Sequence, residues 1–168
     1  LKGSRTVHLD IVDYPGEWLL DLALLDQTYA EWSAKTLERL TAWNAQSYLE
    51  TAKKIDRSVK HDEQIAQKLA QSYTDVLHAA RADGAYDCTP GRFLLPGDVA
   101  GSPALTFAPL PNAGTARGSL GREMARRFEA YKSKVVEPFF RDHFARLDRQ
   151  VILMDVLGAI HKGPQALE

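Results

Sequence analysis

Two aliphatic segments at opposite ends of the chain constrain the fold more than any other feature. Residues 6–13, TVHLDIVD, alternate so that Val7, Leu9 and Ile11 share one face, and residues 151–156, VILMDV, are almost continuously apolar. Both patterns are typical of β-strands. Because a lone pair of strands is marginal in water, we expect an α/β fragment, mostly α, whose two strands are parallel neighbours in a larger sheet.

The sequence between these segments is helical. Residues 17–55 contain no Gly or Pro, and a second helical pattern begins at Asp62, a suitable N-cap, and stops at Gly84. Glycines and prolines then interrupt residues 84–121, which we expect to form an ordered loop. A last helix is predicted over 119–147, with a kink at Pro138. Trp32 and Trp43 lie on an apolar helical face and are expected in the core.

Composition excludes several classes of function. The 21 basic and 22 acidic side chains give a net charge of -1, so no overall field attracts nucleic acid or an anionic membrane. The single Cys88 cannot form an internal disulfide, and no apolar run is long enough for a transmembrane segment. The five histidines show no metal-binding spacing. We therefore expect a cytoplasmic protein that does not bind nucleic acid.

The turn Asp13-Tyr14-Pro15-Gly16-Glu17 is the strongest candidate for chemistry. It fits the D-x-x-G element that follows a strand in P-loop NTPases. There Asp13 would hold Mg²⁺ through a water, and Gly16 would offer its backbone N–H to a γ-phosphate. Glu17 would orient or polarise the attacking water. The alternative is a turn that only ends a strand.

Longer strings place the chain in a family. LDIVDYPGEWLLDLALL, followed by TPGRFLLPGD, GSPALTFAPLP and VVEPFFRDHFARLDRQVILMDVLGAI, closely resembles the YcjX-like family of stress-associated P-loop proteins, DUF463. The resemblance implies a G-protein-like nucleotide-binding domain with a large helical insertion. It implies Mg²⁺ with GTP or ATP, GTP being favoured by that layout. Residues 1–17 and 149–168 would belong to the nucleotide-binding domain, and residues 18–148 would form the insertion.

Two expected nucleotide-binding elements are missing. No G-x-x-x-x-G-K-[ST] loop occurs, and the string Lys53 to Asp56 only partly matches the base-reading element [NT]-K-x-D. We therefore expect an internal piece of a longer NTPase, inactive alone and with no nucleotide bound. The alternative is a non-catalytic helical module that binds a protein effector or self-associates.

Other polar residues receive structural interpretations. Asp155 ends the second aliphatic segment, and its expected role is an N-cap. Arg122, Arg126 and Arg127 form a basic patch early in the last long helix. Because Glu123 and Glu129 lie nearby, we expect solvated ion pairs there rather than a phosphate or nucleic-acid site.

Overall fold

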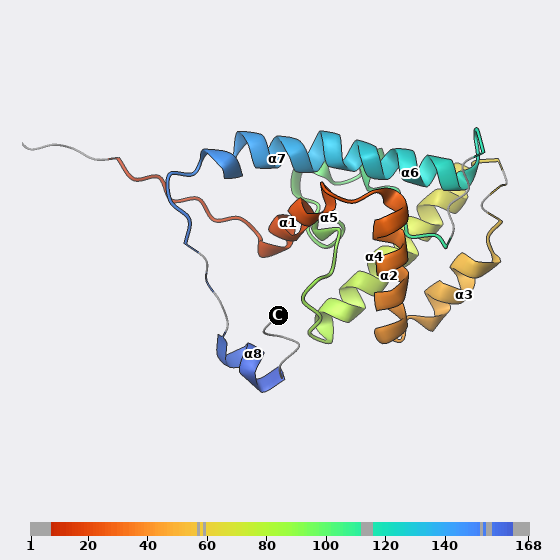
Figure 1. The fold of residues 1–168 in the computed structure, drawn as a ribbon, viewed down its shortest axis with the longest axis horizontal. Helices are drawn as coiled ribbons and strands as arrows, with labels where there is room; N and C mark the ends of the chain where they lie inside the picture. Colours follow the sequence, from red (N-terminus) through yellow and green to blue (C-terminus); the bar gives the residue numbers. More distant parts are fainter. Residues whose placement is uncertain are drawn as a thin grey trace, which may run out of the picture.

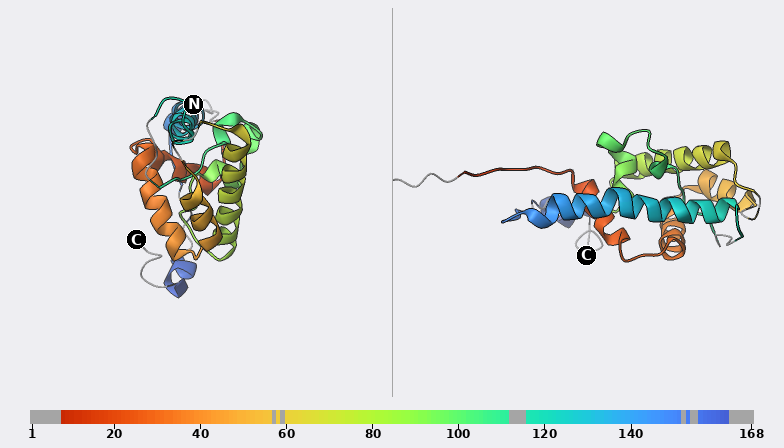
Figure 2. Two further views of the ribbon diagram at one scale, coloured as in Figure 1. Left: turned by 90° about the vertical axis from the view of Figure 1, so that its right-hand side faces the viewer. Right: turned by 90° about the horizontal axis from the view of Figure 1, so that it is seen from above.

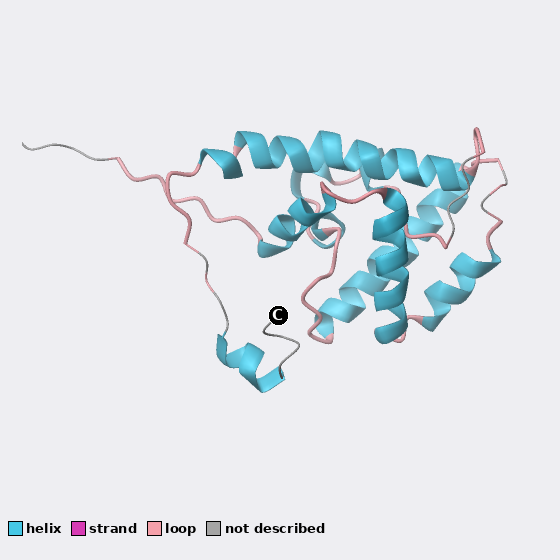
Figure 3. Ribbon diagram, viewed as in Figure 1, coloured by secondary structure: helices cyan, strands magenta, loops and turns pink. Residues whose placement is uncertain are grey.

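The chain folds into a bundle of helices (Figures 1 and 3). The computed structural model describes residues 8–56, 58, 60–111, 116–151, 153 and 156–162. The helices in these ranges are α1 (Gly16–Leu20), α2 (Tyr29–Ala42), α3 (Gln46–Lys54), α4 (Glu63–Ala82), α5 (Gly91–Leu94), α6 (Leu120–Tyr131), α7 (Glu137–Asp142) and α8 (Val156–Lys162). Short 3₁₀ turns occupy Asp21–Leu24, Gly97–Val99, Pro103–Leu105 and Phe144–Arg146.

Helices α6 and α7 form one long rod because a π-helical turn, Lys132–Val136, joins them. Helix α7 begins directly after this turn. Its second residue is Pro138, which cannot donate a backbone hydrogen bond. Beneath the rod, α2, α3 and α4 lie side by side (Figure 2). Helix α2 packs directly on the rod, α3 packs on α2, and α4 packs on α3 and α5.

The ends of α4 lie where the sequence predicts them, but the break between α2 and α3 was not predicted. The Asp62 carboxylate accepts hydrogen bonds from the backbone N–H groups of Gln64 and Ile65, which confirms it as the N-cap of α4. Gly84, at φ 90°, follows the end of that helix. Asn44, at φ 55°, separates α2 from α3 without any Gly or Pro. Asn is among the residues that tolerate this left-handed conformation.

Aromatic rings fill the centre of the bundle. The Trp32 ring of α2 stacks on Phe128 of α6 with centroids 5.0 Å apart, and its edge meets Phe107 at 5.4 Å. Phe93 of α5 packs edge-on against Phe107 at 4.9 Å. Trp32, Phe107 and Phe128 are completely buried. The core therefore brings α2, α5 and α6 together around Phe107, which lies in a loop.

That central loop, residues 106–110, crosses the bundle interior in an irregular conformation. Phe107, Ala108 and Leu110 are buried, so their backbone carbonyls need partners other than water. Hydroxyls supply them. Tyr29 donates to the Ala108 carbonyl at 2.7 Å, Ser33 to Leu110 at 2.9 Å and Tyr48 to Pro109 at 2.8 Å. The hydroxyls of two tyrosines and one serine thus satisfy the buried carbonyls of this loop.

The predicted pair of parallel strands is wrong. Within the described residues there is no strand, only an isolated antiparallel bridge between Lys60 and Ser119 (Figure 3). Residues 8–13 run away from the bundle, with Leu9 79% and Ile11 85% exposed. Val151 and Leu153 are 84% and 92% exposed, and Val156 begins α8. The apolar pattern is present, but the described part of the chain contains no neighbouring backbone with which to form a ladder. Asp155 and positions 6, 7, 152 and 154 lie outside the described residues.

Replacing Trp32 tests the aromatic core. We expect Trp32→Ala to lower the free energy of unfolding by about 3–5 kcal/mol, because a completely buried ring leaves a cavity. Trp43→Ala is the matched control, since the Trp43 ring is only partly buried. Denaturant titration followed by circular dichroism should show a clearly smaller loss for the control. Equal losses would contradict this account of the core.

Candidate functional site

The Asp13–Glu17 turn packs against the end of the rod and leads into α1. The Tyr14 ring lies edge-on to Phe139 of α7, with centroids 5.2 Å apart, and also contacts His143. Trp18 meets the same Phe139 ring at 5.9 Å. The Tyr14 ring of the turn and the Trp18 ring of α1 therefore both pack on α7, one on either side of Gly16 and Glu17 in the sequence.

Asp13 and Gly16 are left free by this packing. Asp13 is exposed and forms no hydrogen bond or ion pair with any described residue. Gly16 is also exposed, and a Cβ added there would have no neighbour within 4 Å. Gly16 is helical, so its backbone does not require glycine either. The helical bundle thus gives no packing reason for these two residue types.

Glu17 contacts the bundle through both its side chain and its backbone. Its Oε1 accepts a hydrogen bond from Arg81 Nη2 of α4 at 2.8 Å, forming an ion pair. Its carbonyl lies against Gly91 of α5, where an added Cβ would stand 1.9 Å from the Glu17 oxygen. Its Oε2 has no hydrogen-bond partner among the described residues. One carboxylate oxygen is thus used for attachment and the other is available.

Asp21, one turn further on, is the most deeply buried acidic side chain near the turn. Its two carboxylate oxygens accept hydrogen bonds from the backbone N–H of Gly91 at 2.7 Å and of Arg92 at 3.3 Å. The Tyr131 hydroxyl of α6 also donates to it. Burial raises the pKa of Asp21 from 3.8 to about 6, although these donors favour the charged form. Asp21 thereby joins the end of α1 to α5 and to the rod.

Arg92 completes the contact on the other side of α1. Its guanidinium lies over the Trp18 ring, 3.4 Å from the centroid, and bonds to Asp98 at 2.9 Å. The Trp18 indole N–H donates to the Leu95 carbonyl at 2.8 Å. We call Glu17, Trp18, Asp21, Gly91 and Arg92 the anchor. It brings the string GEWLLD into direct contact with the string TPGRFLLPGD, about 70 residues apart.

Sequence reasoning singled out Asp13, Gly16 and Glu17 but missed the anchor. The structure keeps these three residues in one turn and attaches only Glu17 to the bundle. A signal for Asp21 was present, because it is a single carboxylate within the apolar run WLLDLALL. A charged residue at such a position is buried only with compensating partners.

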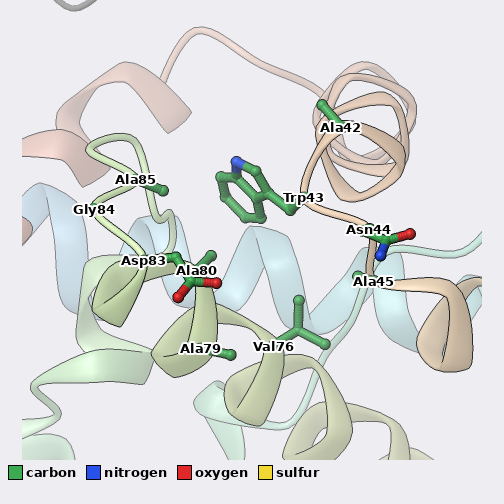
Figure 4. A pocket seen from close by; sticks show the side chains of 10 residues that line it. All are labelled: Ala42, Trp43, Asn44, Ala45, Val76, Ala79, Ala80, Asp83, Gly84 and Ala85. Atoms are coloured by element: carbon green, nitrogen blue, oxygen red, sulfur yellow. The ribbon is translucent and has the colours of Figure 1, made fainter. Parts of the chain in front are cut away.

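Other places in the described structure offer less chemistry. A cavity of about 500 Å³ beside Trp43 is lined mainly by alanines, with Asp83 as its one ionisable group (Figure 4). No group of His, Cys, Asp and Glu within the described ranges could hold a metal ion. Burial raises the pKa of Cys88 to about 11, so its thiol is not an activated nucleophile. None of the helices described is long and apolar enough to cross a membrane.

Comparison with known proteins decides the family. Residues 1–168 match the YcjX-like family, DUF463. The chain belongs to this family. It is 39% identical over 178 residues to a protein of Escherichia coli (strain K12) named Ras-like GTPase YcjX, and 36% identical over 179 residues to one of that name from Shewanella oneidensis. These alignments cover 98% of this chain but 38% and 37% of the relatives.

The resemblance inferred from the motifs is therefore confirmed, and the relatives' names support a GTPase-type P-loop family. The chain spans under two-fifths of the length of these YcjX relatives.

Two glycines test the anchor. We expect Gly91→Ala to lower the free energy of unfolding by about 1–3 kcal/mol, because its methyl group would collide with the Glu17 carbonyl. Gly16→Ala should change stability by less than about 0.5 kcal/mol, since a Cβ there meets nothing. Thermal and denaturant unfolding of both variants provides the comparison. The anchor would be disproved if Gly91→Ala were as harmless as Gly16→Ala.

The raised pKa of Asp21 gives stability a specific pH dependence. The folded state holds the Asp21 proton more tightly than the unfolded state does. The stabilisation that this protonation gives to the folded state is therefore fully present below about pH 4 and is lost as the pH rises through about 6. Asn cannot titrate. The stability of the wild type relative to Asp21→Asn should therefore fall by up to about 3 kcal/mol between pH 4 and pH 7. Urea titrations across this range measure the difference, and a difference independent of pH would contradict the burial of a titrating carboxyl.

Proposed function

We propose that this chain supplies the Asp13–Glu17 turn to the nucleotide site of a GTPase of the YcjX-like family. Residues 1–17 and 149–168 then belong with the nucleotide-binding domain, and residues 18–148 form a helical insertion in it. The exposed apolar side chains of the two ends, such as Leu9, Ile11 and Leu153, support this division, because they require cover from other parts of a protein.

The observation that carries the proposal is the freedom of Asp13 and Gly16. The bundle uses neither residue, although it uses their neighbours Tyr14, Glu17 and Trp18. An exposed glycine with no close neighbour leaves its backbone N–H accessible to a phosphate oxygen. An exposed carboxylate without a partner in the described chain is a suitable oxygen ligand for Mg²⁺, directly or through a water.

Each residue then has one role. Asp13 holds Mg²⁺, which when bound offsets the negative charge of the phosphates. Gly16 donates its backbone N–H to the γ-phosphate. Glu17 keeps Oε1 on Arg81 and uses Oε2 to accept a hydrogen bond from the attacking water, which orients that water for in-line attack.

GTP is the proposed nucleotide, because the relatives at 39% and 36% identity are named Ras-like GTPases. We further propose that hydrolysis drives a switch, in which the segment after Gly16 transmits the nucleotide state to the helical insertion. The stress-related role that the family resemblance implied belongs to this proposal. A full-length protein containing this sequence is needed to test it.

Substitutions in such a full-length protein test the assignment. We expect Glu17→Gln to lower kcat for GTP by about 10²–10⁴-fold with little change in nucleotide affinity, because the orienting carboxylate is lost while the amide oxygen can still accept the hydrogen bond from Arg81. Asp13→Asn should weaken the dependence on Mg²⁺, and Gly16→Ala should slow turnover without loss of stability. Asp26→Asn, at an exposed carboxylate in the loop before α2, is the control.

Phosphate release with GTP and with ATP measures these effects. Unchanged turnover in both Glu17→Gln and Asp13→Asn would reject the proposed roles. A preference for ATP would keep the roles but correct the nucleotide.

A further inference from the structure

A second cavity lies at the opposite end of the rod from the anchor. It has a volume of about 670 Å³ and is lined by two crossing segments and the first turns of α6, with Lys60, His61, Arg117, Arg122, Glu123 and Arg126 among the lining residues. The segments are held together by the bridge between Lys60 and Ser119 and by a hydrogen bond from the His61 N–H to the Gly118 carbonyl at 2.8 Å. The N-terminal end of α6 and the turn at α1 are far apart along the bundle (Figure 1).

The lining is strongly basic, although the chain as a whole is slightly acidic. Its one carboxylate, Glu123, forms ion pairs with two arginines. Glu123 Oε1 lies 2.6 Å from Arg126 Nη2 and 2.9 Å from Arg127 Nε. These hydrogen bonds lower the pKa of Glu123 to about 2, so it stays ionised and bound to them. The expectation of solvated ion pairs is thus correct for Arg126, whereas Arg127 forms its ion pairs while buried.

Three cations in the lining remain without compensation. Lys60, Arg117 and Arg122 form no ion pair with any residue in the described ranges. The neighbouring positions 57, 59 and 112–115 contain no Asp or Glu in the sequence. Holding three like charges around one cavity costs electrostatic energy, which an anion in the cavity would offset.

One ring nitrogen of His61 is buried beside the cavity. His61 lines the cavity, and its Nδ1 is inaccessible to solvent and has no hydrogen-bond partner among the described residues. Its other ring nitrogen lies 3.2 Å from a Glu63 oxygen. Because Nδ1 is closed to solvent, a ligand in the cavity does not reach it, and the three unpaired cations are the groups that an anion would contact.

We propose that this cavity binds a phosphate-bearing anion, separate from the nucleotide site of the Asp13–Glu17 turn. The guanidinium groups of Arg117 and Arg122 suit the paired oxygens of a phosphate, and Lys60 adds a compact charge. The cavity is large enough for a diphosphate with part of the molecule that carries it. The ligand is either a free phosphate compound or the headgroup of an anionic lipid, which share this chemistry.

Titration of the full chain with inorganic pyrophosphate tests the proposal. We expect saturable binding by calorimetry at low salt, weakened at least about tenfold by Arg122→Gln and by Lys60→Gln. Arg146→Gln is the matched control, because Arg146 is also exposed and forms no ion pair with a described residue but lies beyond α7. Its affinity for pyrophosphate should stay within about twofold of the wild type.

A parallel experiment with vesicles containing phosphatidylserine distinguishes the two sources. Binding of vesicles that is lost in Arg122→Gln but kept in Arg146→Gln would assign a lipid headgroup, and pyrophosphate binding alone would assign a free ligand. The proposal is overturned if neither probe binds, or if Arg146→Gln weakens binding as much as Arg122→Gln. Thermal unfolding of the variants checks that each remains folded.

Discussion

The buried carboxylate of Asp21 is the interaction on which the arrangement of the turn depends. Removing this charge from water is costly, and burial raises the pKa of Asp21 to about 6. Hydrogen-bond donors held in fixed positions offset part of that cost. Those donors are the N–H groups of Gly91 and Arg92 and the hydroxyl of Tyr131. Gly91 and Arg92 belong to α5, and Tyr131 belongs to α6. The Asp21 side chain therefore holds the end of α1 against both α5 and the rod.

This constraint divides the turn into a free part and a fixed part. Asp13 and Gly16 face away from the bundle, whereas Glu17 and Trp18 are attached to α4, α5 and α7. Tyr14, between Asp13 and Gly16 in the sequence, also packs on Phe139 of α7, so free and attached residues alternate along the turn. Gly16 is directly bonded to Glu17, so the free residues of the turn are covalently next to residues that contact α4, α5 and α7.

Much of the helical body follows from the sequence, but the anchor and the ends do not. Apolar spacing and the Asp62 cap locate α4, because these signals act within a few residues. Asp21 meets its partners across 70 and 110 residues, a distance over which local patterns carry no information. The alternation at 8–13 indicates an apolar face, but it does not identify a neighbouring strand that would cover that face. The strand prediction is therefore wrong for the described residues. Long motifs succeeded where periodicity failed, since they identify the family directly.

Amide hydrogen exchange in a full-length protein containing this sequence tests the central claim most directly, namely that the turn both faces nucleotide and is tied to the bundle. Exchange would be followed over residues 14–21 and at Gly91 and Arg92, with and without Mg²⁺ and a GTP analogue that cannot be hydrolysed. The account predicts that bound nucleotide changes protection in both segments together, and that Asp21→Ala uncouples them. Saturation with nucleotide that leaves both segments unchanged would contradict it.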